Sequence, residues 1–247
     1  MKQGVGPKGR RNVLVTGGGS GIGRAVAQDF LANGDDVTIA GRRMDALEET
    51  SGGKMRCLAV DITDEAAVKS MFDRPYDVVV ANAGAGHGMP VKDMPLELFN
   101  DTVAVNLTGV FLTFREALQD MPGGGRLIAM ASIASLKGGG GLAAYAAAKH
   151  GVLGLVRSLA IEVAKSGITC NAVCPGFVDT AMADGAVRNV MKRMDIDRVT
   201  AEKMLVSNNP MRRMITCDEV VAAVKFLASP EASMINGHDL VVSGGEI

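Results

Sequence analysis

The chain has 247 residues, and its 26 basic and 27 acidic side chains give a formal net charge of −1. This length can bury a core of its own, and the near-neutral balance argues against a nucleic-acid or membrane partner, because both need a concentrated basic face. The one basic cluster, Lys8, Arg10 and Arg11, lies in a Gly-rich start that indicates a flexible tail over residues 1–11.

No apolar run reaches the roughly 18 residues of a membrane span, and the N-terminus lacks the layout of a secretory signal. We therefore expect a cytoplasmic protein. The four cysteines have neither a disulfide-framework spacing nor a zinc spacing, so we expect reduced thiols and no metal site; they are Cys57, Cys170, Cys174 and Cys217.

Short apolar runs alternate with longer segments of helical period along the chain, and this pattern predicts an α/β fold with a doubly wound, Rossmann-type parallel sheet. The first strand, Val13-Leu14-Val15, leads through a Gly-rich turn into a helix over residues 22–33, which Gly34 ends. Further strands are predicted at 37–40, 57–60, 78–80, 127–130, 168–173 and 239–242, with long helices at about 96–120, 142–166 and 217–228. No linker or repeat interrupts this order, so we expect one domain over residues 12–247, with about seven strands and helices on both faces of the sheet.

Residues 180–214 break the alternation, because this segment has no strand pattern and is rich in methionine. Mobile helices that cover a pocket as a lid are one interpretation, and an amphipathic helix pair packed on the core is the other. The two can hold together. The methionines are Met182, Met191, Met194, Met204, Met211 and Met214.

The turn after the first strand reads Thr-Gly-Gly-Gly-Ser-Gly-Ile-Gly from Thr16 to Gly23 and opens a helix, the context in which a glycine pattern binds phosphate. The missing side chains allow backbone N–H groups to approach a pyrophosphate, and the positive end of the helix stabilises its charge. The sequence therefore predicts a dinucleotide site, with a plain flexible turn as the alternative.

The end of the second strand, where an acidic side chain would accept hydrogen bonds from an adenosine ribose, holds Gly41-Arg42-Arg43 instead. No carboxylate is present to repel a ribose 2′-phosphate, and two guanidinium groups are placed to bind it. NADP(H) is favoured and NAD(H) remains possible. The alternative is that both arginines are solvated loop residues.

Tyr145 and Lys149 stand four residues apart in an alanine-rich helical run, which puts both side chains on one face. An ammonium group beside a phenol is expected to lower the phenol pKa, so that the phenol can exchange a proton at physiological pH. A surface pair without a function is the alternative interpretation for these two residues alone.

Taken with the residues around it, this pair resembles the short-chain dehydrogenase/reductase family in its single-domain form, from about Asn12 to Gly245. Ser132 matches the family's catalytic serine, Asn106 its helix asparagine and Asp61 the acid that contacts adenine. Further matches are the run Asn82-Ala83-Gly84 after the fourth strand and the run Cys174-Pro175-Gly176-Phe177-Val178-Asp179-Thr180 after the sixth.

The resemblance implies that Ser132 hydrogen bonds the substrate carbonyl, Tyr145 transfers a proton to or from its oxygen, Lys149 holds the nicotinamide ribose, and Asn106 anchors a water. Thr180 would hold the nicotinamide carboxamide. Loop and motifs together give these candidate cofactor contacts: Gly17, Gly19, Ser20, Gly21, Ile22, Gly23, Arg42, Arg43, Asp61, Ile62, Asn82, Ala83, Gly84, Tyr145, Lys149, Pro175, Gly176, Val178 and Thr180.

The chain departs modestly from the family pattern. Ala81 stands where the family has a first asparagine, which puts one structural hydrogen bond in doubt. The stretches 42–57 and 64–77 are short, so two peripheral helices should be clipped.

The substrate side is expected to be mainly apolar with an adaptable lid, which suits an acyl chain or ring better than a sugar. His87 is placed to reach the pocket mouth, with an ordinary exposed histidine as the alternative. The candidate substrate contacts are Ser132, Ile133, Leu142, Tyr145, Phe177 and Met182, and Leu136, Met191 and Met194 are further candidate walls.

The leading hypothesis is an NADPH-dependent reductase of a ketone, because the region 167–213 looks like enzymes that reduce 3-oxoacyl thioesters or polyketide ketones. The same region is similar to 3-hydroxybutyrate dehydrogenases, so oxidation of a hydroxy acid or secondary alcohol is the alternative. A dinucleotide-sensing protein without turnover is the non-enzyme alternative. The resemblance also implies a homo-oligomer, a tetramer or dimer, formed through the helices at 96–120 and 142–166.

Overall fold

The computed structural model describes residues 9–86 and 88–247; Lys8 and His87 lie outside the described residues. Seven strands form one sheet in the order β3-β2-β1-β4-β5-β6-β7, and each pair of neighbours is parallel. This confirms the predicted doubly wound sheet. The strands are β1 (Asn12–Thr16), β2 (Asp36–Gly41), β3 (Arg56–Ala59), β4 (Val78–Ala81), β5 (Arg126–Met130), β6 (Thr169–Pro175) and β7 (Asp239–Val242).

The order of the strands reverses at β1: β2 and β3 are added on one side of it, and β4 and the later strands on the other. In such sheets ligands bind at the carboxyl ends of the strands beside the reversal. The central strands are buried along their whole length, as β4 and β5 show, because helices cover both faces.

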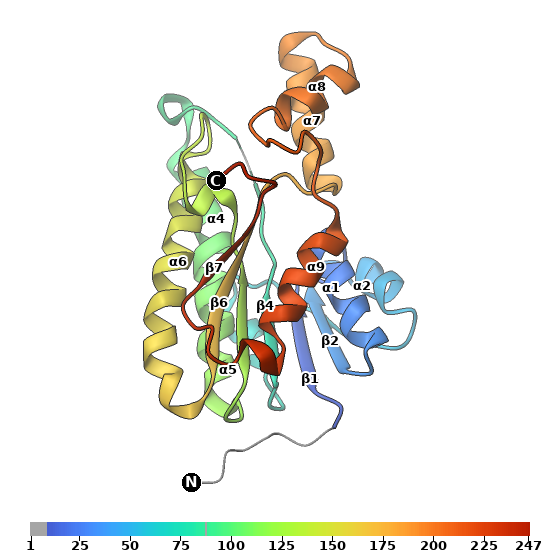
Figure 1. Ribbon diagram of the computed structural model, residues 1–247, viewed down its shortest axis with the longest axis vertical. Helices are drawn as coiled ribbons and strands as arrows, with labels where there is room; N and C mark the ends of the chain where they lie inside the picture. Colours follow the sequence, from blue (N-terminus) through green and yellow to red (C-terminus); the bar gives the residue numbers. More distant parts are fainter. Residues whose placement is uncertain (1–8, 87) are drawn as a thin grey trace.

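Helices cover both faces of the sheet (Figure 1), and an apolar cluster lies between the sheet and the helices on each face. On one face α3 (Glu65–Ser70), α5 (Gly109–Asp120) and α6 (Ala143–Val163) pack through side chains such as Phe114 and Val152. On the other face α1 (Gly21–Ala32), α2 (Met44–Ser51) and α9 (Cys217–Leu227) pack through Phe30, Leu47 and Leu227.

The predicted helix ends agree with the structure in most places. Gly34 follows α1 with φ +90°, a conformation that glycine adopts without strain. The expected clipped helices are α2, with 8 residues, and α3, with 6. The predicted helix at 96–120 is divided into α4 (Leu96–Val103), a π-helical turn (Ala104–Thr108) and α5.

Helices α7 (Ala181–Met194) and α8 (Arg198–Leu205) form the predicted lid segment and project beyond the end of the sheet (Figure 1). Within them only Ala183, Val187 and Ala201 are buried. Few side chains of the pair are therefore buried, and both the lid and the packed helix pair stay predictions.

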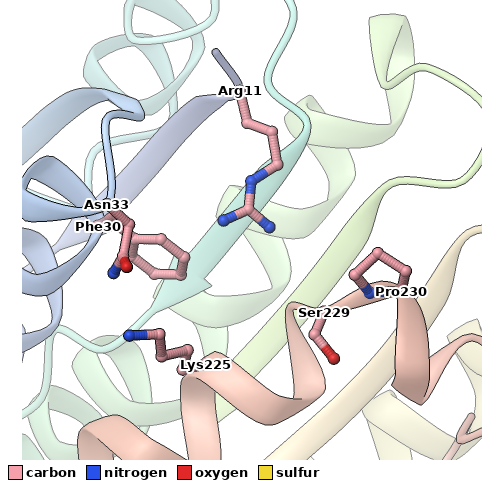
Figure 2. Close-up of a pocket in the computed structure, with 6 residues that line it drawn as sticks. All are labelled: Arg11, Phe30, Asn33, Lys225, Ser229 and Pro230. Atoms are coloured by element: carbon pink, nitrogen blue, oxygen red, sulfur yellow. The ribbon is translucent and has the colours of Figure 1, made fainter. Parts of the chain in front are cut away.

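A cavity of about 310 Å³ lies at the amino end of β1, the edge opposite the carboxyl ends of the strands (Figure 2). Arg11 lines it and donates to Asp35 at 2.7 and 3.0 Å and to the carbonyl of Ala228 at 2.9 Å. The contacts of the domain thus begin at Arg11, inside the predicted tail. The second cation of this cavity, Lys225, is bound to Asp29 at 3.2 Å. Among the described residues, no helix is both long and apolar enough to cross a membrane.

Candidate active site

The Gly-rich loop lies tightly against the ends of β2 and β4. The amide of Gly17 donates to the carbonyl of Ala40 at 2.7 Å, and a Cβ on Gly17 would come 2.8 Å from Nδ2 of Asn82. Ser20 precedes α1, but its hydroxyl caps no amide of the described helix. The first amides of α1 and its positive end therefore suit a pyrophosphate, and the glycines form the cradle that such a ligand needs.

Asn82 joins the loop after β4 to β1. Its backbone N–H donates to Oγ1 of Thr16 at 3.0 Å, and its Nδ2 donates to the carbonyl of Thr16 at 3.0 Å. Ala83 donates to the same hydroxyl at 3.1 Å. These bonds hold the loop beside the Gly-rich turn, so the predicted cofactor residues of this loop lie next to the glycine cradle.

Gly84, in the loop after β4, lies close to both Asn106 and Lys149. A Cβ at this position would be 2.9 Å from Oδ1 of Asn106 and 3.7 Å from Nζ of Lys149. A side chain here would fill the space beside both groups, so a glycine is required for the close approach.

Asn106 is fully buried in the π-helical turn. Its Nδ2 donates to the carbonyls of Ala85 at 2.8 Å and Thr102 at 2.9 Å, and its Oδ1 accepts from the amide of Ala85 at 3.3 Å. The side chain thus fixes the helix to the loop after β4. Both Nδ2 hydrogens are engaged by backbone, and the water-anchoring role stays a prediction.

Ser132 follows β5 and opens a 3-10 turn (Ile133–Ser135). Its Oγ accepts from the amide of Ala134 at 3.1 Å, and its own amide donates to Oγ of Ser135 at 3.2 Å. This reciprocal capping fixes the backbone of Ser132 and directs its side chain, because two donors of the turn are satisfied at once.

Tyr145 and Lys149 lie one turn apart on α6, as predicted, and the ammonium is 5.7 Å from the centre of the phenol ring. Nζ of Lys149 donates to the carbonyl of Met130 at 2.7 Å, and only 3% of this residue is exposed. The carbonyl of Met130, at the end of β5 and two residues before Ser132, therefore holds the lysine near the phenol ring.

The pKa of Tyr145 is raised, chiefly by burial, although a hydrogen bond with Ser132 acts in the lowering direction. This corrects the expectation that Lys149 lowers the phenol pKa. Spacing alone does not show the burial of either group. Burial also lowers the pKa of Lys149 to about 8, so the lysine carries its charge less firmly than an exposed one.

The predicted adenine side lies at the ends of β2 and β3. Asp61 accepts from the amide of Thr63 at 2.9 Å and from its hydroxyl at 2.8 Å. These bonds, with a smaller effect of the nearby Arg42, lower the pKa of Asp61. Arg42 and Arg43 are both exposed, Arg43 as the residue before α2. Ile62 is buried against the helix at Gly109, where a Cβ would come 2.5 Å from its Cδ1.

The segment after β6 leads to the start of the lid. Gly176 donates to the carbonyl of Val242 at 3.0 Å, and the buried Val178 forms a bridge with Ile215. Thr180 precedes α7 and its Cγ2 is 3.2 Å from the Cβ position of Gly21. Thr180, the first residue of the predicted lid, therefore lies beside the glycine cradle.

The predicted substrate residues differ in their exposure. Ile133 is buried, Leu142 and Phe177 are half-buried, and Met182 is 54% exposed. Sδ of Met182 lies 3.8 Å from the Cβ position of Gly86, so the start of α7 comes close to the loop after β4.

Met194 is at the far end of α7, about 18 Å along the helix from Met182 at 1.5 Å per residue. The places of Met191 and Met194 in the pocket wall stay predictions.

Three contributors were not predicted. Arg24 donates to the carbonyl of Gly19 at 2.9 Å and thereby supports the Gly-rich loop. Lys137 and Glu246 form an ion pair at 2.8 Å beside the Ser132 turn. No local pattern could reveal that pair, because its members are 109 residues apart.

The cysteines are all free thiols, and burial raises the pKa of Cys170 to about 12 and that of Cys174 to about 11. Such thiols are poor nucleophiles. Among residues 9–86 and 88–247, no group of three or more His, Cys, Asp or Glu side chains is arranged to hold a metal ion.

Comparison with known proteins follows this geometry. A sequence model of a family described as enoyl-(acyl carrier protein) reductase matches residues 17–246. The 3-oxoacyl-(acyl-carrier-protein) reductase MabA of Mycobacterium avium is 37% identical over 243 residues, which cover 95% of this chain and 89% of that protein. The chain is a short-chain dehydrogenase/reductase.

Other members of this family are similar over nearly the whole chain. The D-beta-hydroxybutyrate dehydrogenase of Rhizobium meliloti (strain 1021) is 30% identical over 252 residues, which cover 95% of this chain and 98% of that protein. The crystal structure of an actinorhodin polyketide ketoreductase with NADPH has a TM-score of 0.90 at 32% identity and covers 96% of this chain and 97% of its own.

Membership makes the chain an NAD(P)(H)-dependent oxidoreductase that acts on CH–OH groups. The glycine cradle, the open amides of α1 and the buried lysine beside Gly84 fit a nicotinamide dinucleotide.

Proposed function

We propose that this short-chain dehydrogenase/reductase uses NADPH to reduce a ketone, a 3-oxoacyl thioester or a similar carbonyl, to a secondary alcohol. The observation that carries the proposal is the convergence of Ser132, Tyr145 and Lys149 at the carboxyl end of β5, beside the glycine cradle. A bound nicotinamide dinucleotide would supply the hydride.

The three side chains divide the remaining chemistry between them. Ser132 donates a hydrogen bond to the carbonyl oxygen and stabilises the negative charge that develops there. Tyr145 then gives its proton to that oxygen. Lys149 would orient the ribose next to Gly84, and its ammonium group stabilises the phenolate that Tyr145 becomes until a proton from solvent restores the phenol.

NADP(H) is the proposed cofactor, with NAD(H) as the weaker one. Arg42 is exposed at the end of β2, close enough to Asp61 to lower the pKa of that carboxyl, and so stands at the adenosine side of the crevice. Position 41 and the two positions after it bring no carboxylate that would repel a 2′-phosphate. Arg42 and Arg43 can bind such a phosphate bidentately.

The substrate class rests on the lid and on the relatives. Met182 brings an exposed, flexible apolar side chain to the mouth of the site, which suits an acyl chain. MabA is named as a 3-oxoacyl reductase and the actinorhodin enzyme as a polyketide ketoreductase. The name of the hydroxybutyrate dehydrogenase supports the second candidate, oxidation of a hydroxy acid or secondary alcohol.

A homotetramer or homodimer is the proposed assembly. Large apolar side chains are exposed on the helices that the resemblance assigns to subunit contacts: Leu96 on α4 is 72% exposed, Phe111 on α5 42% and Ile161 on α6 80%. Such a surface is costly for a monomer in water. Light scattering coupled to gel filtration should give two or four times the 25.6 kDa chain mass, and a monomer would contradict the proposal.

The test of function is the decay of NADPH absorbance, and separately of NADH absorbance, with acetoacetyl-CoA. Rapid consumption of NADPH and slow consumption of NADH is the expected result. Consumption of neither, with clear reduction of NAD⁺ by 3-hydroxybutyrate, would replace the proposal with the second candidate.

A further inference from the structure

Lys137 and Glu246 form an ion pair that the reaction proposed above does not use. Nζ of Lys137 donates to Oε1 of Glu246 at 2.8 Å. The carboxylate side chain is 5% exposed, whereas the lysine side chain is 37% exposed. A buried carboxylate without a paired cation would be strongly unfavourable, so the Glu246 carboxylate keeps the Lys137 ammonium beside it.

Lys137 ends the turn that Ser132 begins. The amide of Ser135 donates to the carbonyl of Ser132 at 2.8 Å, and the amide of Lys137 donates to the carbonyl of Ile133 at 3.1 Å. The amide of Ser132 in turn donates to Oγ of Ser135 at 3.2 Å. A shift of Lys137 therefore reaches Ser132 through hydrogen bonds over a single turn.

The chain after Lys137 gives this turn no support. Residues 138–141 are four glycines, and a Cβ on Gly138 or Gly140 would meet nothing within 4 Å. Glycine has the largest backbone freedom, so such a run transmits motion instead of restraint. Within and beyond this run, the amide of Leu142 donates to the carbonyl of Gly139 at 3.0 Å, and the amide of Met89 donates to the carbonyl of Gly141 at 2.8 Å.

Glu246, in contrast, rests on the end of the sheet. Its Oε2 is 3.7 Å from the Cβ position of Gly176, directly after β6, and its amide donates to the carbonyl of Ser243 at 3.4 Å, directly after β7. The ion pair thus connects the Ser132 turn to two strand ends.

We propose that Lys137 and Glu246 are positioning residues for Ser132: their ion pair anchors the end of the Ser132 turn to the sheet and isolates it from the glycine run. The hydroxyl of Ser132 then stays directed at Tyr145 and at the substrate oxygen. The catalytic meaning of this anchor rests on the proposed function, but the anchor itself is tested without any substrate.

The phenol of Tyr145 reports the position of Ser132, because their hydrogen bond acts to lower the phenol pKa. The chain has two tyrosines and no tryptophan. Biosynthetic 3-fluorotyrosine, whose phenol is more acidic than that of tyrosine, gives two ¹⁹F resonances, and the Tyr76→Phe variant assigns them. The pH midpoint of the Tyr145 resonance is then measured in Lys137→Met and Glu246→Met.

Positioning and simple charge effects predict different signs. If the pair positions Ser132, both variants lose the hydrogen bond and both raise the Tyr145 midpoint, by about half a pKa unit. If only charge acts, removing the cation raises the midpoint and removing the carboxylate lowers it. Opposite shifts, or no shift in either variant, would overturn the proposal.

Two controls separate anchoring from general destabilisation. Lys137→Arg keeps the ion pair and should keep the parent midpoint. Lys225→Met removes a more exposed lysine–carboxylate pair between α9 and α1, with Asp29 at 3.2 Å, and should also leave the midpoint unchanged. A shift in Lys225→Met as large as that in Lys137→Met would make the effect one of global stability.

Turnover supplies the second readout. With NADPH and acetoacetyl-CoA, Lys137→Met should lower kcat by about tenfold, less than the loss of a whole oxyanion donor, while the Kd of NADPH stays unchanged. An unchanged kcat would contradict the positioning role. If the parent protein reduces no ketone, the proposed function fails, and the ¹⁹F titration still decides the anchor.

Discussion

Burial of Lys149 makes the folded protein less stable at neutral pH than it would be with an apolar side chain there. The residue is 3% exposed, and burial lowers its pKa from 10.5 to about 8. At 1.36 kcal/mol per pKa unit, this difference corresponds to about 3 kcal/mol.

The sign follows from proton linkage. Below pH 8 the lysine is charged in both the folded and the unfolded chain, and the whole cost is present. Between pH 8 and 10.5 the unfolded chain binds the proton that the folded chain releases, so this cost declines as the pH rises.

The perturbation is Lys149→Met, which keeps a similar volume and removes the charge. At pH 7 it removes about 3 kcal/mol of desolvation cost and loses a charged hydrogen bond to Met130 worth about 1.5–3 kcal/mol. We expect the variant to equal the parent or exceed it by about 1 kcal/mol at pH 7, and to be the less stable protein at pH 10.

The assay is urea unfolding of parent and variant at pH 7, 8, 9 and 10. The difference between the two free energies of unfolding cancels every titration that the proteins share, so its change with pH reports Lys149 alone. Lys225→Met, at an exposed lysine, should give a difference that does not change over this range. A constant difference between parent and Lys149→Met would refute the reasoning.

Three further outcomes are expected. Arg42→Ala should raise the KM for NADPH by about 10–100-fold and leave that for NADH nearly unchanged, since a charged phosphate contact is worth about 1.5–3 kcal/mol; equal changes for both cofactors in initial rates would place Arg42 elsewhere. Gly23→Ala would push a Cβ into the carbonyl of Gly17, so the free energy of unfolding in urea should fall by about 1–3 kcal/mol and calorimetry should show weaker NADPH binding. The control Gly185→Ala, in open space on α7, should raise the free energy of unfolding by about 0.5–1 kcal/mol. Asn106→Leu would leave buried backbone groups unpaired and should cost at least about 2 kcal/mol by the same unfolding assay; a neutral result would mean that the π-helical turn does not need its carboxamide.

The sheet could be predicted because its strands are continuous apolar runs. Residues such as Val79 and Ile128 are buried on a strand that helices cover from both sides, so the local sequence alone carries the signal. The same holds for Gly34 and for the Tyr145–Lys149 spacing, since helix termination and the i, i+4 face are local properties.

What could not be predicted depends on contacts between distant segments. The π-helical turn at Asn106 forms because its carboxamide bonds to the loop at Ala85, and helical periodicity cannot show this. The predicted direction of the Tyr145 pKa shift was wrong, because residue spacing does not show that the phenol is buried. The ion pair of Lys137 and Glu246 joins the turn after β5 to the last residues of the chain.

The most direct test of the account is a comparison of parent and Tyr145→Phe in NADPH-dependent reduction of acetoacetyl-CoA, together with the Kd of NADPH from its fluorescence. Phenylalanine keeps the ring and removes only the acidic hydroxyl. The account predicts that kcat falls by about 10²–10⁴-fold while the Kd stays within about twofold. Turnover by Tyr145→Phe at the parent rate would contradict the account, because the phenol would not be the proton donor.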